Sequence, residues 1–203
     1  MAISITLITI SSVIVAYLIG SIPSAVVVSH LMGLPDPRAN GSGNPGATNV
    51  LRLSGKKAAA ITLLGDVLKG FVPVLLVRSY LDSPFIVAAV ALAAFLGHIF
   101  PISLRFRGGK GVSTALGVIA AITWPTALIA LATWLSTVAV FRYSSLAALI
   151  TALLVPIYTG FLTSNLIYTS AIGIIALLII WRHRSNIRKL IAGTETRIGQ
   201  KVR

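Results

Sequence analysis

Three short segments of this sequence gather the residue types that bind anions. The first runs from Gly41 to Asn49 and is followed by Arg52. Glycines at alternate or near-alternate positions allow φ > 0, so that successive backbone N–H groups can point inward and form a concavity for an anion. We expect Thr48 or Asn49 to cap the next helix, whose N-terminus adds partial positive charge. A simple turn between helices would need only one or two glycines.

The second segment runs from Arg105 to Thr114 and again places a glycine-rich loop, Gly108 to Gly111, at the start of a predicted helix. It resembles a P-loop only superficially, because Lys110 is followed by glycine rather than Ser or Thr, so nucleoside triphosphate hydrolysis is disfavoured. Lys110 supplies a point charge and the backbone N–H groups supply directional donors. The segment therefore predicts a second anion cradle.

The third segment runs from Trp181 to Glu195 near the end of the chain. A basic amphipathic helix that binds anionic lipid would explain its arginines, including Arg182. It would not explain His183, Asn186 and Glu195, which recur at helical spacing near the predicted membrane surface. We therefore treat these three polar residues as candidates for a site.

The composition indicates that membrane helices hold these segments. Of the 203 residues, 56% are hydrophobic and 10% are charged, whereas about a quarter of a soluble domain is charged. Only 4 acidic residues oppose 17 Lys and Arg, which excludes a metal site built from several carboxylates. The sequence has no cysteine, which excludes thiol nucleophiles and Cys-type zinc sites. The composition predicts an all-α polytopic membrane protein.

Seven apolar runs predict about seven transmembrane helices. They cover about 4–29, 57–78, 84–100, 112–123, 126–141, 144–161 and 165–181. The first run contains Pro23 and should be a kinked helix. The fourth run is short, and Trp124-Pro125 separates it from the fifth, so the pair could be two spans or a re-entrant hairpin. We favour two spans.

Basic residues in short loops stay on the cytoplasmic side of a membrane, which fixes the orientation. With seven spans and the N-terminus outside, the cytoplasmic segments hold every Lys and Arg except Lys69 and Arg78. We predict one polytopic domain over residues 1–203, with a cytoplasmic C-terminus. The segments 30–57, 101–111 and 182–203, which contain the three motifs, then share the cytoplasmic face.

Two ionisable residues, Asp66 and Lys69, lie three positions apart within the second predicted span. We interpret them as a structural ion pair on one helix face, and we interpret the lone His98 as structural too. An alternative function is a small anion or phosphate-ester transporter, which such an intramembrane pair would also suit. A transporter should have motifs on both faces, whereas this chain gathers them on one. A CDP-alcohol phosphotransferase is excluded because its metal site needs several aspartates.

Together the three segments resemble the acyl-phosphate:glycerol-3-phosphate acyltransferases of the bacterial inner membrane, the PlsY family. The matching residues are Asp36-Pro37-Arg38, Gly41 to Asn49 and Arg52; His98, Pro101 and Phe106 to Val112; and Arg182-His183, Asn186-Ile187, Gly193 and Glu195. The resemblance extends from Tyr17 to Glu195, and three motifs in order with matching spans between them are specific. One departure is Arg107, where the family usually carries Lys.

The resemblance implies transfer of a long acyl chain from acyl phosphate to the 1-hydroxyl of sn-glycerol 3-phosphate, which gives 1-acylglycerol 3-phosphate (lysophosphatidate) and phosphate. It implies acyl phosphate, glycerol 3-phosphate and membrane lipid as partners, and a functional link to the enzyme that makes acyl phosphate. We expect no cofactor, no metal and no nucleic acid. The two substrates bring about four negative charges to one pocket, which the two glycine loops and the basic side chains can balance.

The resemblance and the residue types together assign the site. Substrate binding is assigned to Ser42, Asn44, Thr48, Asn49, Arg52, Gly108, Gly109, Lys110, Gly111 and Arg182, and the reaction to His183, Asn186 and Ser42. Glu195 should tie the tail to the cytoplasmic loops through an arginine. Either loop could take either phosphate. Since acyl phosphate is already activated, its own phosphate oxygen is the first candidate for the base, His183 is the second, and Ser42 as an acyl carrier is the third.

Overall fold

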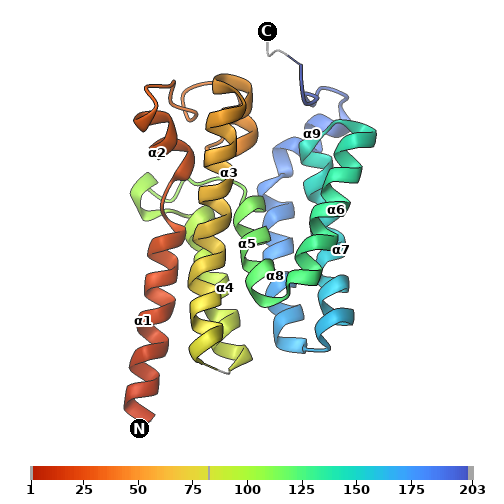
Figure 1. Ribbon diagram of the computed structural model, residues 1–203. Coiled ribbons are helices and arrows are strands. Elements are labelled where there is room, and N and C mark those ends of the chain that lie inside the picture. The colour runs from red at the N-terminus through yellow and green to blue at the C-terminus, as the bar shows by residue number, and fades with distance from the viewer. Residues whose placement is uncertain (1, 82, 201–203) are drawn as a thin grey trace.

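The computed structural model describes residues 2–81 and 83–200 of the chain. Lys201 and Arg203 of the predicted cytoplasmic tail lie outside the described residues. The described part contains nine α-helices, one short 3₁₀ helix and no strand, which confirms the all-α prediction. Figure 1 shows the long helices side by side in a bundle, with α9 and the tail at the end opposite to the start of α1.

The helices cover the predicted apolar runs, but α3, Ala47–Tyr80, begins inside the predicted cytoplasmic segment 30–57 and is interrupted at Gly55, where φ is +83. Their bounds are α1 Ala2–Gly20, α2 Ser24–Leu31, α3 Ala47–Tyr80, α4 Pro84–Ile99, η1 Ile102–Leu104, α5 Val112–Ile122, α6 Trp124–Phe141, α7 Ser144–Thr163, α8 Leu166–Arg182 and α9 Arg184–Ile191. Four helices in the described part are long and apolar enough to cross a membrane, and the number rises to six if each of two bent pairs is one span. These pairs are α1 with α2, bent by 47°, and α8 with α9, bent by 56°.

The break between α1 and α2 is the predicted proline kink. Pro23 lies at the N-cap of α2, and the Ile22 carbonyl before it lies in the break between the two helices, where it accepts the backbone N–H of Ser24 at 3.0 Å. Lys69 of α3 donates a hydrogen bond of 2.8 Å to that carbonyl oxygen. A neighbouring helix thus adds a charged donor to a carbonyl in the break, where the regular hydrogen bonding of the helix is interrupted.

The runs 112–123 and 126–141 form two helices, which meet at Thr123; both the two-span prediction and the re-entrant hairpin call for two helices. With 11 residues, α5 is about 17 Å long at 1.5 Å per residue, well short of the roughly 30 Å of a bilayer core. Arg78 of α3 donates hydrogen bonds to the carbonyl oxygens of Ala121 and Ile122. These carbonyls lie at the C-terminal end of α5, where no partner exists within the helix. A charged side chain therefore closes the end of the short helix.

Glycines let α1 approach α4, and α3 approach α5, at backbone contact distance. A Cβ on Gly20 would overlap the Ala94 carbonyl oxygen, and one on Gly97 would overlap that of Tyr17. The same relationship holds between Gly117 of α5 and the Val67 carbonyl of α3. Small residues at such interfaces give close van der Waals packing between membrane helices. This packing fixes the loop between α4 and α5, which carries the second motif.

Candidate active site

All three motif segments line one cleft of about 690 Å³. The lining residues are Asp36, Arg38, Ala39, Ser42, Gly43, Asn44, Pro45, Leu104, Arg107, Gly108, Lys110, Arg182, Arg184, Ser185, Asn186 and Lys189. Six of these are cationic, and Asp36 is the one carboxylate among the described residues that line the cleft. The volume suits a small ligand, and the charge balance favours an anion.

Asn49 organises the first glycine-rich segment from within. Its Nδ2 donates to the carbonyl oxygens of Pro37, at 2.8 Å, and Asn40, at 3.1 Å, while its Oδ1 accepts the backbone N–H of Ser42 at 3.0 Å. The expectation that Thr48 or Asn49 caps the helix is wrong, because α3 begins at Ala47 with Gly46 as its N-cap residue. The buried amide of Asn49 instead serves the loop backbone, which otherwise would have lacked partners.

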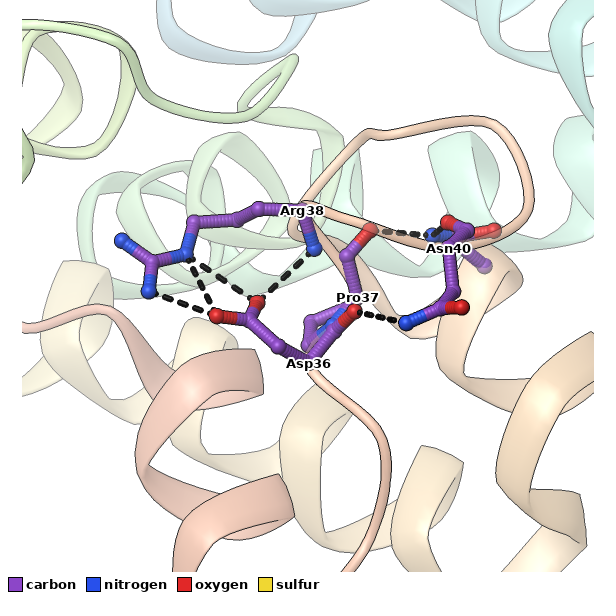
Figure 2. Close-up of polar contacts among 5 residues, drawn as sticks. Asp36, Pro37, Arg38 and Asn40 are labelled. Atoms are coloured by element: carbon purple, nitrogen blue, oxygen red, sulfur yellow. Dashed lines mark hydrogen bonds and ion pairs between the residues drawn. The ribbon is translucent and has the colours of Figure 1, made fainter.

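The carboxylate in the cleft is paired with its nearest arginine (Figure 2). Asp36 accepts hydrogen bonds from the backbone N–H of Arg38 at 2.9 Å, from its Nε at 3.0 Å and from its Nη2 at 2.6 Å. Asn40 Nδ2 donates to the Asp36 carbonyl oxygen at 3.0 Å. The hydrogen bonds from Arg38 hold the pKa of the Asp36 carboxyl below its ordinary value. Asp36 therefore stays ionised and neutralised by Arg38, which limits its repulsion of an anion in the cleft.

The second glycine-rich loop ends at Gly111, the N-cap residue of α5, with φ +84, so the predicted loop at a helix start is confirmed. Arg182 of α8 braces this loop, since its Nε donates to the Gly109 carbonyl at 3.0 Å and its Nη2 to the Gly108 carbonyl at 2.5 Å. A Cβ on Gly108 would overlap the His98 carbonyl oxygen, and one on Gly109 would overlap the His98 ring. Only glycine fits at these two positions, and Arg182 has a structural role besides lining the cleft.

A buried polar cluster lies behind the second loop. Lys69 and Asp66 form an ion pair at 2.8 Å, one turn apart on α3, in the geometry expected from their spacing. His98 Nδ1 lies 2.9 Å from Thr114 Oγ1 and 3.6 Å from Asp66 Oδ1. Asp66, Lys69 and His98 are all buried and do not line the main cleft. They support the floor of the loop.

A chain of side-chain hydrogen bonds joins the second motif to the third. Lys110 Nζ donates to Asn186 Oδ1, Asn186 Nδ2 donates to Glu195 Oε1 at 2.7 Å, and Ser145 Oγ donates to the same carboxylate oxygen at 2.6 Å. Burial lowers the pKa of the Lys110 ammonium to about 8. Lys110 is therefore a partly desolvated cation whose remaining partner is a neutral amide, so it can still receive an anion.

The tail is tied to the bundle differently from the expectation. Glu195 is held by Ser145 and Asn186 rather than by an arginine. An arginine does bind the next residue, since Arg52 Nη2 donates to the Thr196 carbonyl oxygen at 3.2 Å. Ser145 was not identified from the sequence. It is the second residue of the apolar helix α7, and its one signal in the sequence is that it follows the basic turn at Arg142.

Half of the predicted site residues line the cleft. Those that line it are Ser42, Asn44, Gly108, Lys110, Arg182 and Asn186, and those that do not are Thr48, Asn49, Arg52, Gly109, Gly111 and His183. Thr48 Oγ1 lies 3.2 Å from Ser144 Oγ of α7. His183 is buried, and its Nδ1 lies 2.8 Å from the Ile179 carbonyl oxygen, so this nitrogen carries the proton and donates it.

The arrangement of the motifs agrees with sequence comparison. The sequence profile of the family described as glycerol-3-phosphate acyltransferase matches residues 10–193, which is most of the chain and includes every residue named above as lining the cleft. The chain belongs to this family. A glycerol-3-phosphate acyltransferase of Thioalkalivibrio sulfidiphilus is 57% identical over 188 residues, covering 93% of each chain. That of Methylococcus capsulatus is 50% identical over 186 residues, covering 92% of this chain and 94% of the relative.

Solved structures of this acyltransferase family share the fold. The glycerol 3-phosphate form of PlsY, an integral membrane glycerol 3-phosphate acyltransferase, is 40% identical with a TM-score of 0.89, over 94% of this chain and 96% of that one. The lysophosphatidic acid form is 39% identical with a TM-score of 0.87, over 94% and 95%. With these acyltransferases as relatives and several apolar helices of its own, the chain is a multi-pass membrane protein.

Proposed function

We propose that this protein transfers a long acyl chain from acyl phosphate to the 1-hydroxyl of sn-glycerol 3-phosphate, giving lysophosphatidate and phosphate. The observation that carries the proposal is the single cationic cleft that all three motif segments line. Both substrates are phosphate monoesters or anhydrides, and they bring about four negative charges together. Acceptor and product correspond to the ligands named for the two related PlsY structures.

The cleft has the charge distribution that two phosphates need. Lys110 and Arg182 lie at its glycine loop, while Arg38, Arg184 and Lys189 come from the first and third segments. Cations on several sides of one cleft can hold two phosphates without forcing them into contact. Ser42 and Asn186 add neutral hydrogen-bonding groups for the glycerol hydroxyls and the acyl carbonyl. These are the polar groups that orient a ligand within such a cleft.

The membrane placement follows from the same segments. Seven spans, with α5 counted as a short span, place the N-terminus outside and the three motif segments at the cytoplasmic face of the bacterial inner membrane. Glycerol 3-phosphate then reaches the cleft from solution, while the acyl chain of the donor lies along apolar helices. The enzyme that makes acyl phosphate would supply the donor on the same side.

The chemistry requires one nucleophilic attack and one proton transfer. The glycerol 1-hydroxyl oxygen attacks the acyl carbonyl carbon, the bond from that carbon to the phosphate oxygen breaks, and inorganic phosphate leaves. A phosphate oxygen of the donor takes the hydroxyl proton, so no separate base is needed. His183 is the second candidate, although it does not line the cleft and its Nδ1 pairs with a backbone carbonyl. Ser42 as an acyl carrier is the third.

The electrostatic demands of this step fit the cleft. Negative charge grows on the acyl carbonyl oxygen and on the departing phosphate. Lys110 and the backbone N–H groups of the second loop are the donors nearest to a phosphate bound there. The same N–H groups are the donors for the carbonyl oxygen, because the Asn186 Nδ2 is already bonded to Glu195. Fixed donors of this kind stabilise a transition state because they need no reorganisation during the reaction.

Purified protein in detergent tests the proposal directly. It is given glycerol 3-phosphate with palmitoyl phosphate, palmitoyl-CoA or palmitoyl acyl-carrier protein as separate donors. Of the three donors, we expect only palmitoyl phosphate to react with glycerol 3-phosphate, giving lysophosphatidate and inorganic phosphate in equal amounts. Equal turnover with either thioester would contradict the proposed donor, and no acyl transfer from any donor would contradict the function.

A further inference from the structure

We propose that Ser145 is a positioning residue of the acyltransferase site, which acts on Lys110 through Glu195 and Asn186. The proposal rests on the function proposed above. Ser145 belongs to α7, which carries none of the three motifs, and it does not line the cleft. Its hydroxyl reaches the cleft only through two other side chains.

The hydrogen-bond directions define how this chain works. Lys110 can only donate, so the Asn186 oxygen faces it and the Asn186 Nδ2 must point away. Glu195 Oε1 accepts from that Nδ2 at 2.7 Å, which holds the amide in the orientation that Lys110 requires. Without the Glu195 carboxylate, none of these hydrogen bonds would prevent the Asn186 amide from turning its NH₂ group toward Lys110.

Ser145 in turn holds the carboxylate. Its Oγ lies 2.6 Å from the same Glu195 oxygen, so the two donors fix the position of one acceptor atom. The serine is buried and lies in the first turn of a 20-residue helix, where unpaired backbone N–H groups favour a negative charge. Glu195 lies in a tail without regular structure, whereas Ser145 belongs to a 20-residue helix that packs against α6 and α8. Ser145 therefore holds Glu195 in place relative to the helix bundle, and Glu195 in turn orients Asn186 in the cleft.

The neighbouring serine provides a matched control. Ser144 lies in the same first turn, but its Oγ pairs with Thr48 Oγ1 at 3.2 Å rather than with Glu195. Ser144→Ala removes one hydroxyl from the same helix turn without removing any of the hydrogen bonds that connect Ser145 to Lys110. Ser145→Thr keeps the hydroxyl and serves as the conservative variant.

The test is a double-mutant cycle that combines Ser145→Ala with Asn186→Ala. Two quantities are measured for every variant in detergent: kcat/KM with palmitoyl phosphate and glycerol 3-phosphate, and the affinity for glycerol 3-phosphate by calorimetry. Thermal unfolding confirms that each variant is folded. We expect Ser145→Ala to lower kcat/KM about tenfold, the scale of one hydrogen bond to a charged group, and Ser145→Thr to restore most of it.

The positioning role is tested by the energetic coupling between the substitutions of Ser145 and Asn186. In the Asn186→Ala background the effect of Ser145→Ala should fall below about twofold, because the link to Lys110 is already cut. The Ser144→Ala effect should be the same in both backgrounds. Equal Ser145→Ala losses in both backgrounds, or a Ser145→Ala variant within twofold of wild type, would overturn the inference.

A failure of the positioning role of Ser145 can be distinguished from a failure of the proposed function. A wild-type protein that transfers palmitate while Ser145→Ala behaves normally refutes the positioning role alone. A wild-type protein that uses none of the acyl donors refutes the function, and the calorimetric cycle then still reports whether Ser145 couples to Asn186.

Discussion

Lys110 Nζ donates a hydrogen bond to Asn186 Oδ1, although 76 residues separate them in the chain. The bond joins the glycine loop before α5 to the amphipathic helix α9. Both residues line the cationic cleft. The contact makes the second and third motifs one site, and the predictions below test how this site and its scaffold work.

Lys110→Ala should lower kcat/KM for glycerol 3-phosphate and acyl phosphate about 10-fold to 150-fold. One charge-assisted contact to phosphate contributes about 1.5 to 3 kcal/mol, and each 1.4 kcal/mol is tenfold. The variant should unfold near the wild-type temperature, because Lys110 is partly exposed in a loop. Steady-state kinetics in detergent measure the effect, and unchanged kinetics would remove Lys110 from the site.

The activity should decline as the pH rises through about 8. Burial lowers the pKa of Lys110 to about 8, so the ammonium is present below that pH and is lost above it. Phosphate binding needs the charge, and the pH profile of kcat/KM reports groups of the free enzyme. Lys110→Arg keeps a cation at all working pH values and should move the declining limb to higher pH. A limb that stays near 8 in this variant would assign it to another group.

Arg78→Ala should destabilise the protein without disabling the site. It leaves two carbonyl oxygens at the end of α5 without their donor, at a cost of about 1.5 kcal/mol for a partly exposed charged hydrogen bond. The cleft lies elsewhere in the bundle, so kcat/KM at low temperature should stay within about twofold. Thermal unfolding in detergent measures the loss, and Arg78→Lys should recover part of it. An unchanged unfolding temperature would argue against the capping role.

The N-terminus should lie outside and the C-terminus in the cytoplasm. Nearly all Lys and Arg then face inward, as the positive-inside rule requires. A reporter enzyme that works only in the periplasm should be inactive when fused after Arg203. The same reporter should be active when inserted between α3 and α4. The reverse pattern would invert the proposed topology.

Acyl transfer should be direct, without an acyl-enzyme. Double-reciprocal plots with both substrates varied should intersect, as a ternary complex requires. Rapid quenching with labelled palmitoyl phosphate alone should leave no label on the protein. A stoichiometric ester at Ser42 that disappears when glycerol 3-phosphate is added would show that Ser42 carries the acyl group.

The features that depend on local spacing could be predicted from the amino-acid sequence alone. Long apolar runs dictate helices of bilayer length, and Pro23 dictates the 47° break between α1 and α2. Asp66 and Lys69 meet because residues three apart share a helix face. The glycines before α5 predicted the loop at its start because other residues resist the backbone conformation of Gly111. Each of these outcomes follows from interactions within a few residues.

The contacts between side chains of different helices could not be predicted, because they depend on how the bundle packs. Asn49 was expected to be a helix cap, yet its amide bonds to a loop that folds back over it. Ser145 and Glu195 are 50 residues apart, and Arg78 reaches a carbonyl 43 residues away. Such contacts depend on how α3, α5, α7 and the tail pack against one another. That packing is set by shape and close approach over whole helices, to which no single motif corresponds.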